Sequence, residues 1–111
     1  MTQSWPEAYR AVTLRAWHSN RARVAELSTV VSAWRHARVL TPESRRRMRD
    51  LAHALHGSAG TFGHGAASAA ADELERLLAG TDTEVTLDHV AGLVGRIEES
   101  LGEQPDSEPE P

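Results

Sequence analysis

The residue best suited to chemistry in this sequence is His53. Met48, Leu51 and Leu55 recur at helical spacing and define one apolar stripe. At about 100° per residue, His53 lies roughly 165° from the centre of that stripe, so we predict that it faces solvent and not the core. A neutral imidazole offers a nitrogen lone pair near pH 7 without needing a base to deprotonate it, so it can act as a nucleophile.

The residues that share the predicted face of His53 are suited to contact with a partner. On the same helical wheel Gly57 and Gly60 lie within about 40° of His53, and Arg46 and Arg49 lie toward the N-terminus. Glycine inside a helix costs roughly 0.5–1 kcal/mol relative to alanine, and close approach by a large partner is one reason for it to be there. The alternative is that the two glycines only loosen the end of the helix.

The sequence around His53 resembles a known motif. It reads His53-x-Leu55-His56-Gly57 and then Gly63. This is similar to the motif of histidine-containing phosphotransfer (HPt) domains, His-x-Leu-Lys-Gly with a second glycine six residues later. The likeness continues through Ser58-Ala59-Gly60, Phe62 and Ala71-Asp72-Glu73-Leu74-Glu75, which resembles the Ala-x-x-Leu-Glu pattern that follows the motif in that family. It covers roughly residues 41 to 79 and departs at His56, where the family has lysine.

The resemblance implies roles for the residues around the motif. His53 would accept a phosphoryl group from a receiver-domain aspartate and pass it to another receiver. His56 would steady the phosphoryl oxygens in place of lysine, although a neutral imidazole donates only one hydrogen bond; alternatively, it is a flank residue without a role. Arg46, Arg49, Gly57 and Gly60 would meet the receiver, and the arginines are otherwise an ordinary solvated face.

The resemblance also implies partners and cofactors. The partners would be response-regulator receiver domains and a hybrid sensor kinase, and the protein would act stoichiometrically and not as an enzyme. We expect no carboxylate cluster beside His53, and so no cofactor of its own, with Mg²⁺ held by the receiver. We also expect a free-standing protein, although a module cut from a longer kinase would look the same. A competing hypothesis is a helical adaptor that binds a receiver or kinase without being phosphorylated.

Four segments with helical periodicity must position these residues. They run from about Pro6 to Ala37, from Pro42 to Thr61, from Ala66 to Ala79 and from Thr86 to Leu101. Ser19-Asn20 is a possible break in the first segment. Because no segment alternates polar and apolar residues in the manner of a strand, we predict an all-α fold, an antiparallel four-helix bundle with a long or divided N-terminal helix.

Composition indicates one small domain. The 111 residues are 40% hydrophobic, which is enough for one core, and we assign residues 1–102 to the HPt-like bundle. Residues 103–111 are acidic and proline-rich, so we predict a disordered tail. The absence of cysteine fits a reducing compartment, and no apolar stretch is long enough for a membrane span or a signal peptide. We therefore expect a cytoplasmic monomer that does not bind membranes.

Two other function classes have some support in the sequence. The basic cluster Arg45-Arg46-Arg47-x-Arg49 suggests nucleic-acid binding, but it is short and has no interleaved aromatic residues. It also belongs to a chain of acidic net charge, −4, because the +6 of residues 1–50 is cancelled by the −6 of residues 51–102 and the tail adds further acidic residues. Metal binding by His53, His56 and His64 lacks cysteine and a fourth ligand. We expect neither nucleic-acid binding nor a metal site.

Overall fold

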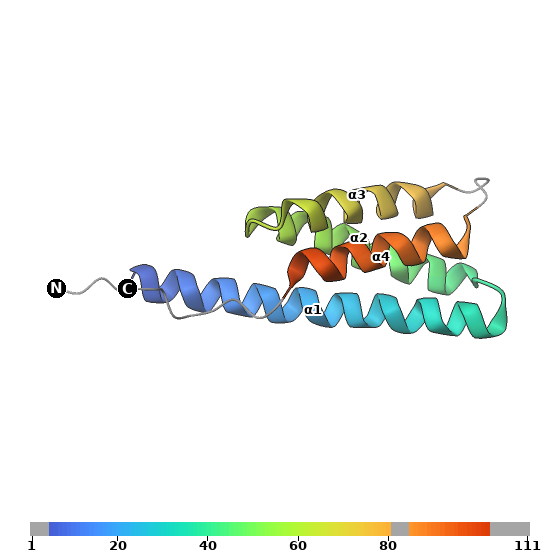
Figure 1. The fold of residues 1–111 in the computed structure, drawn as a ribbon, viewed down its shortest axis with the longest axis horizontal. Coiled ribbons are helices and arrows are strands. Elements are labelled where there is room, and N and C mark those ends of the chain that lie inside the picture. The colour runs from blue at the N-terminus through green and yellow to red at the C-terminus, as the bar shows by residue number, and fades with distance from the viewer. Residues whose placement is uncertain (1–4, 81–84, 103–111) are drawn as a thin grey trace.

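Four helices make up the protein in the computed structural model, which describes residues 5–80 and 85–102 (Figure 1). They are α1 (Trp5–Ala37), α2 (Pro42–Thr61), α3 (Gly65–Ala79) and α4 (Leu87–Leu101), and the described residues include no strand. The predicted all-α fold is confirmed, and each predicted helix boundary lies within one residue of the observed one. The tail predicted over 103–111 lies outside the described residues.

The helices form a ring in which each contacts two neighbours. α1 packs on α2 and α4, and α3 packs on the same two helices from the other side. Successive helices run antiparallel, and the N-terminal part of α1 extends beyond the other three (Figure 1). This follows from length, since α1 has 33 residues whereas α2 has 20 and α3 and α4 have 15 each.

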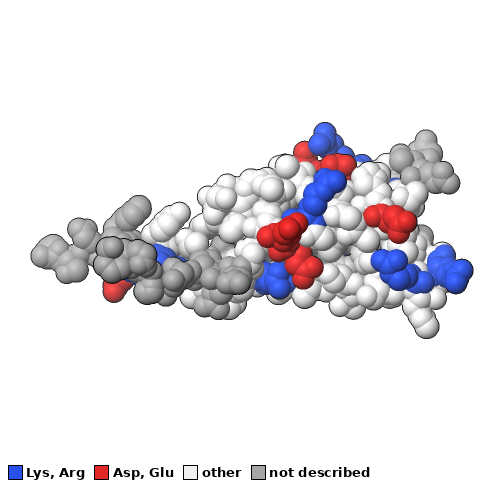
Figure 2. All heavy atoms as spheres, viewed as in Figure 1, with Lys and Arg blue, Asp and Glu red and all other residues white. Residues whose placement is uncertain are grey.

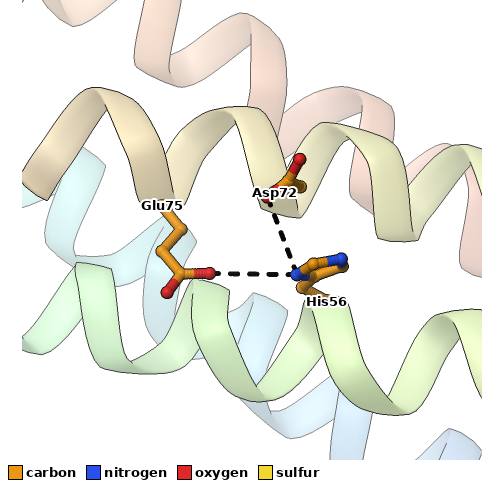
Figure 3. A group of neighbouring side chains, drawn as sticks. All are labelled: His56, Asp72 and Glu75. Carbon is orange, nitrogen blue, oxygen red and sulfur yellow. Dashed lines mark ion pairs between the residues drawn. The ribbon is translucent and has the colours of Figure 1, made fainter.

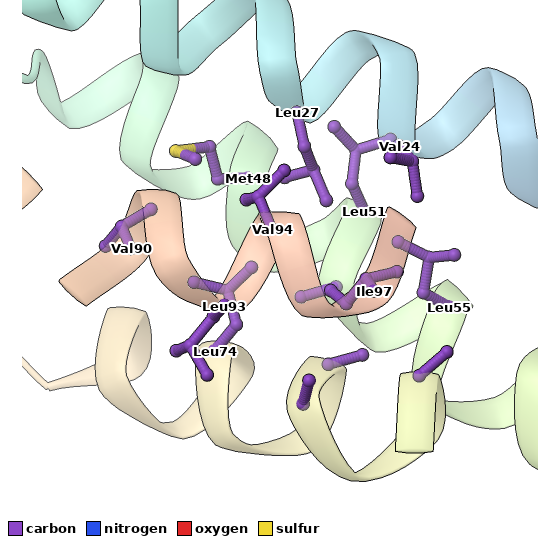
Figure 4. Close-up of a cluster of buried hydrophobic side chains, with 14 of the residues drawn as sticks. Val24, Leu27, Met48, Leu51, Leu55, Leu74, Val90, Leu93, Val94 and Ile97 are labelled. Atoms are coloured by element: carbon purple, nitrogen blue, oxygen red, sulfur yellow. The ribbon is translucent and has the colours of Figure 1, made fainter. Parts of the chain in front are cut away.

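The core lies between the four helices and receives side chains from all of them (Figure 4). Met48, Leu51 and Leu55 are at most 5% exposed, which confirms the predicted apolar stripe of α2. The opposite face of α2 is thereby directed away from the core. No helix among the described residues is both long enough and apolar enough to cross a membrane.

α1 is continuous, so the possible break at Ser19-Asn20 does not occur. Asn20 is only 1% exposed, and its Nδ2 donates a hydrogen bond to Ser58 Oγ of α2 at 3.1 Å. Nη1 of Arg23 donates to the Asn20 Oδ1 at 2.8 Å. Both ends of the buried amide are therefore satisfied, which removes the cost of placing a polar side chain inside the bundle. Asn20 links α1 to α2 instead of ending α1.

Two arginines of the basic cluster make contacts between helices. Arg45 donates from Nε to the carbonyl oxygen of Leu78 at 2.9 Å and from Nη2 to that of Gly80, so its positive charge lies at the negative end of α3. Arg47 pairs with Glu26 of α1 through Nε–Oε2 and Nη2–Oε1 contacts of 2.6 and 2.8 Å. These hydrogen bonds lower the pKa of the Glu26 carboxyl and raise the pKa of Arg47. Half of the cluster is thus used within the fold.

Candidate functional site

His53 lies in the middle of α2, on the face opposite the core. Its side chain is 75% exposed, whereas the neighbouring Ala52 is fully buried. The predicted exposure of His53 is therefore confirmed. Because the imidazole projects from the helix into solvent, a large partner can reach it.

Glu75 of α3 fixes one nitrogen of the His53 ring. Nδ1 of His53 lies 2.8 Å from Oε2 of Glu75. An ionised carboxylate only accepts hydrogen bonds, so Nδ1 carries the proton in this pair, and Nε2 of the neutral ring keeps its lone pair. The periodicity of α2 does not predict this partner, because Glu75 belongs to another helix. The available signal was the Leu74-Glu75 pair, which ends the family-like pattern in α3.

His56 faces α3 and lies opposite two carboxylates (Figure 3). Its Nδ1 is 3.7 Å from Oδ1 of Asp72 and 3.9 Å from Oε1 of Glu75. The expectation that no carboxylate cluster lies beside His53 is therefore wrong. A helical wheel of α2 shows only the residues of that helix, whereas Asp72 and Glu75 reach the site from the adjacent α3.

The two glycines predicted to admit a partner have different surroundings. A Cβ added at Gly57 would meet no atom within 4 Å, so this position is open. A Cβ added at Gly60 would lie 3.0 Å from Oγ of Ser68 in α3. That hydroxyl donates a hydrogen bond to the carbonyl oxygen of His56 at 2.9 Å. Close packing against α3 therefore explains glycine at position 60, and nothing in the fold explains it at position 57.

Arg46 and Arg49 lie on the same side of α2 as His53, one to two turns toward its N-terminus. Together with Arg45 they line a shallow hollow of about 340 Å³ whose other wall is the end of α3, including Leu78. Nη2 of Arg49 is 3.7 Å from Oδ1 of Asp50, an exposed pair that contributes little to stability. Basic and acidic side chains are interspersed on the face shown in Figure 2, so that face has no single basic patch.

The structure does not gather the three histidines of the metal-binding alternative. His64 precedes α3, and its Nδ1 lies 3.3 Å from the carbonyl oxygen of Ser100 in α4. Among the described residues, the group that could hold a metal ion consists of His56, Asp72 and Glu75. His64 does not take part in it.

The antiparallel four-helix bundle presents an exposed histidine, His53, in the middle of a helix, with one ring nitrogen bonded to a carboxylate. Such an arrangement is suited to taking up and releasing a transferable group. The sequence model of the Hpt domain matches residues 17–103. The chain belongs to the HPt domain family, which assigns it a histidine phosphotransfer role in phosphorelays and interaction with receiver domains of two-component systems. No curated protein and no solved structure gave a match.

The surroundings of the two glycines predict opposite responses to alanine. Gly57→Ala adds a methyl group in open space within a helix, so we expect it to raise stability by up to about 1 kcal/mol. Gly60→Ala presses on the Ser68 hydroxyl and its hydrogen bond, so we expect a lower free energy of unfolding than in Gly57→Ala by about 1 kcal/mol. Urea unfolding of the full chain measures both.

The control is the same Gly60→Ala change in a Ser68→Ala background. Removing the hydroxyl removes the closest contact, so the penalty should shrink there. If Gly60→Ala costs the same in both backgrounds, contact with Ser68 is not the reason for glycine at this position.

Proposed function

We propose that this protein is a phosphorelay intermediate that receives a phosphoryl group on His53 from a receiver aspartate and passes it to a second receiver. The observation that carries the proposal is the exposed His53 ring whose Nδ1 is held by Glu75. In the forward step the Nε2 lone pair forms a bond to phosphorus while the bond from phosphorus to the aspartyl oxygen breaks. The aspartate leaves as a free carboxylate, and the reverse step delivers the group to the next receiver.

Glu75 acts in this proposal as a positioning residue. Bond formation at Nε2 places positive charge on the ring, and the Glu75 carboxylate beside Nδ1–H stabilises that charge. The same hydrogen bond holds the ring in one tautomer and limits its rotation. In-line transfer demands such order, because small displacements of the reacting atoms slow the reaction strongly.

The receiver is proposed to dock over the exposed face of α2. Gly57, one turn beyond His53, leaves room for the receiver surface, and Arg46 and Arg49 offer positive charge to an acidic partner. We propose that His56 has a supporting role at the edge of this face. We also predict that the receiver contacts the surface at Gly60. The Mg²⁺ for transfer would be held by the receiver. The protein would act stoichiometrically, as a cytoplasmic monomer, with receivers and a hybrid sensor kinase as its partners.

The first test is the identity of the phosphorylated residue. After incubation with phosphorylated receiver domains, the wild-type chain should carry acid-labile, base-stable phosphate, and His53→Gln should carry none. His56→Gln serves as the matched control and should still be labelled. Labelling that persists in His53→Gln would place the acceptor elsewhere. Receiver binding by a wild type that is never labelled would favour the adaptor alternative.

The role of Glu75 predicts a slower transfer in Glu75→Gln. The amide can donate as well as accept, so it no longer fixes the tautomer of His53 or balances charge on the ring. We expect the rate of labelling to fall by about 10- to 100-fold, the effect typical of losing a partner that orients a metal-bound histidine. Rapid-quench measurement of labelling gives the rate.

Glu73→Gln, on the same helix but facing His89, is the control and should transfer at the wild-type rate. Nitrogen-15 NMR of the imidazole separates positioning from structure, because Glu75→Gln should increase the Nε2–H tautomer of His53 while the amide spectrum of the bundle is kept. An unchanged tautomer together with an unchanged rate would contradict the proposed role.

The docking face predicts a graded effect of side-chain size at position 57. Gly57→Ala and Gly57→Gln project one and then several heavy atoms toward the receiver, so transfer should fall progressively with size. Both variants should unfold at or above the temperature of the wild type, because the added atoms lie in open space. Wild-type transfer rates in both variants would show that the receiver does not cover this position.

A further inference from the structure

The carboxylates beside His56 each direct one oxygen toward it and use the other elsewhere. Oδ2 of Asp72 pairs with Nη2 of Arg76 at 2.8 Å, and Oδ1 is turned to His56. Oε2 of Glu75 bonds to His53, and Oε1 is turned to His56. One nitrogen and two oxygens therefore converge while the neighbouring contacts stay intact, as Figure 3 shows for the three side chains.

From this convergence we propose that His56, Asp72 and Glu75 bind one divalent transition-metal ion, for which Zn²⁺ is the expected ion. The distances from Nδ1 of His56 to the two oxygens, 3.7 and 3.9 Å, are too long for hydrogen bonds, so a gap remains between the three atoms. A tetrahedral ion about 2.0–2.1 Å from each ligand needs ligand atoms about 3.4 Å apart. All three atoms already lie within 4.8 Å of one another, so small side-chain rotations close the site.

The ligand types select the class of ion. Imidazole nitrogen with carboxylate oxygen suits Zn²⁺ and similar ions, whereas Mg²⁺ prefers oxygen ligands in an octahedron. The two carboxylates balance the charge of the ion, and three protein ligands leave a fourth position for water. Histidine at position 56 is essential, because a protonated lysine, the residue that the family has there, carries no lone pair for a metal.

A metal at this site would act on phosphoryl transfer through Glu75, a consequence that rests on the proposed function. The ion would draw negative charge from Glu75 through Oε1 and weaken the hydrogen bond that Oε2 accepts from His53. The ring would then be less well ordered, and positive charge on it less well stabilised. Bound Zn²⁺ is therefore expected to slow the uptake of phosphate by His53.

Calorimetric titration of the metal-free full chain with Zn²⁺ alone tests the site. The wild type should bind one ion, and His56→Gln and Asp72→Asn should each bind it at least about tenfold more weakly. His89→Gln is the matched control, because His89 faces a single carboxylate, that of Glu73, at 3.2 Å. Binding should survive in that variant and in His53→Gln. The absence of saturable binding, or undiminished binding by His56→Gln, would overturn the proposal.

A second measurement tests the consequence for transfer. With Mg²⁺ in excess, added Zn²⁺ should slow labelling of the wild type more than labelling of Asp72→Asn. Equal slowing in both would show that Zn²⁺ acts on the receiver and would overturn the link through Glu75. Because calorimetry needs no phosphoryl transfer, a wild type that binds Zn²⁺ without ever being labelled would contradict the proposed function and leave the metal site standing.

Discussion

The contact between Nδ1 of His53 and Oε2 of Glu75 depends on how closely α3 approaches α2. α3 has Ala67, Ala70 and Ala71 at buried positions, and small side chains let two helices pack at short distance. Because Gly60 has no side chain, the Ser68 hydroxyl of α3 can also lie close to α2 at this point. With larger residues along this seam, Glu75 would lie too far from His53 to order its ring. The alanine-rich composition of α3 thus favours the contact between Glu75 and His53.

α2 is also bonded to its two neighbouring helices near its ends. Asn20 of α1 bonds to Ser58 near the end of α2, and Arg45 near the start of α2 bonds to the end of α3. These two contacts lie on either side of His53, which is in the middle of α2. α1 therefore supports α2 at the end where Ser58 lies, although it places no residue beside His53, and α4 packs on α1 and α3. In the proposed transfer, a well-positioned His53 would leave only the partner to find the reacting geometry.

Sequence periodicity was sufficient for features that one helix determines by itself. The apolar stripe of α2 predicted both the buried Leu51 and the exposed His53, and the helix boundaries followed from the same pattern. The surroundings of Asn20, Gly57 and Gly60 depend on contacts between helices, which the periodicity of a single helix does not show. Asn20 looked like a break because its partner Ser58 lies 38 residues away in sequence. Gly57 and Gly60 looked alike on a wheel of α2, and only the position of Ser68 separates them.

The carboxylates were missed for the same reason, and they change how the site must be understood. A lysine at position 56 would supply a permanent positive charge, whereas His56 between Asp72 and Glu75 supplies one only when it binds a proton or a metal ion. A phosphoryl group on His53 brings negative charge close to Glu75. Asp72 is compensated by Arg76, so Glu75 is the carboxylate whose charge must be shared between the two histidines. A cation bound by His56 would therefore compete with the His53 ring for Glu75. Under the proposed function, histidine in place of the family's lysine would make phosphoryl uptake at His53 depend on that cation.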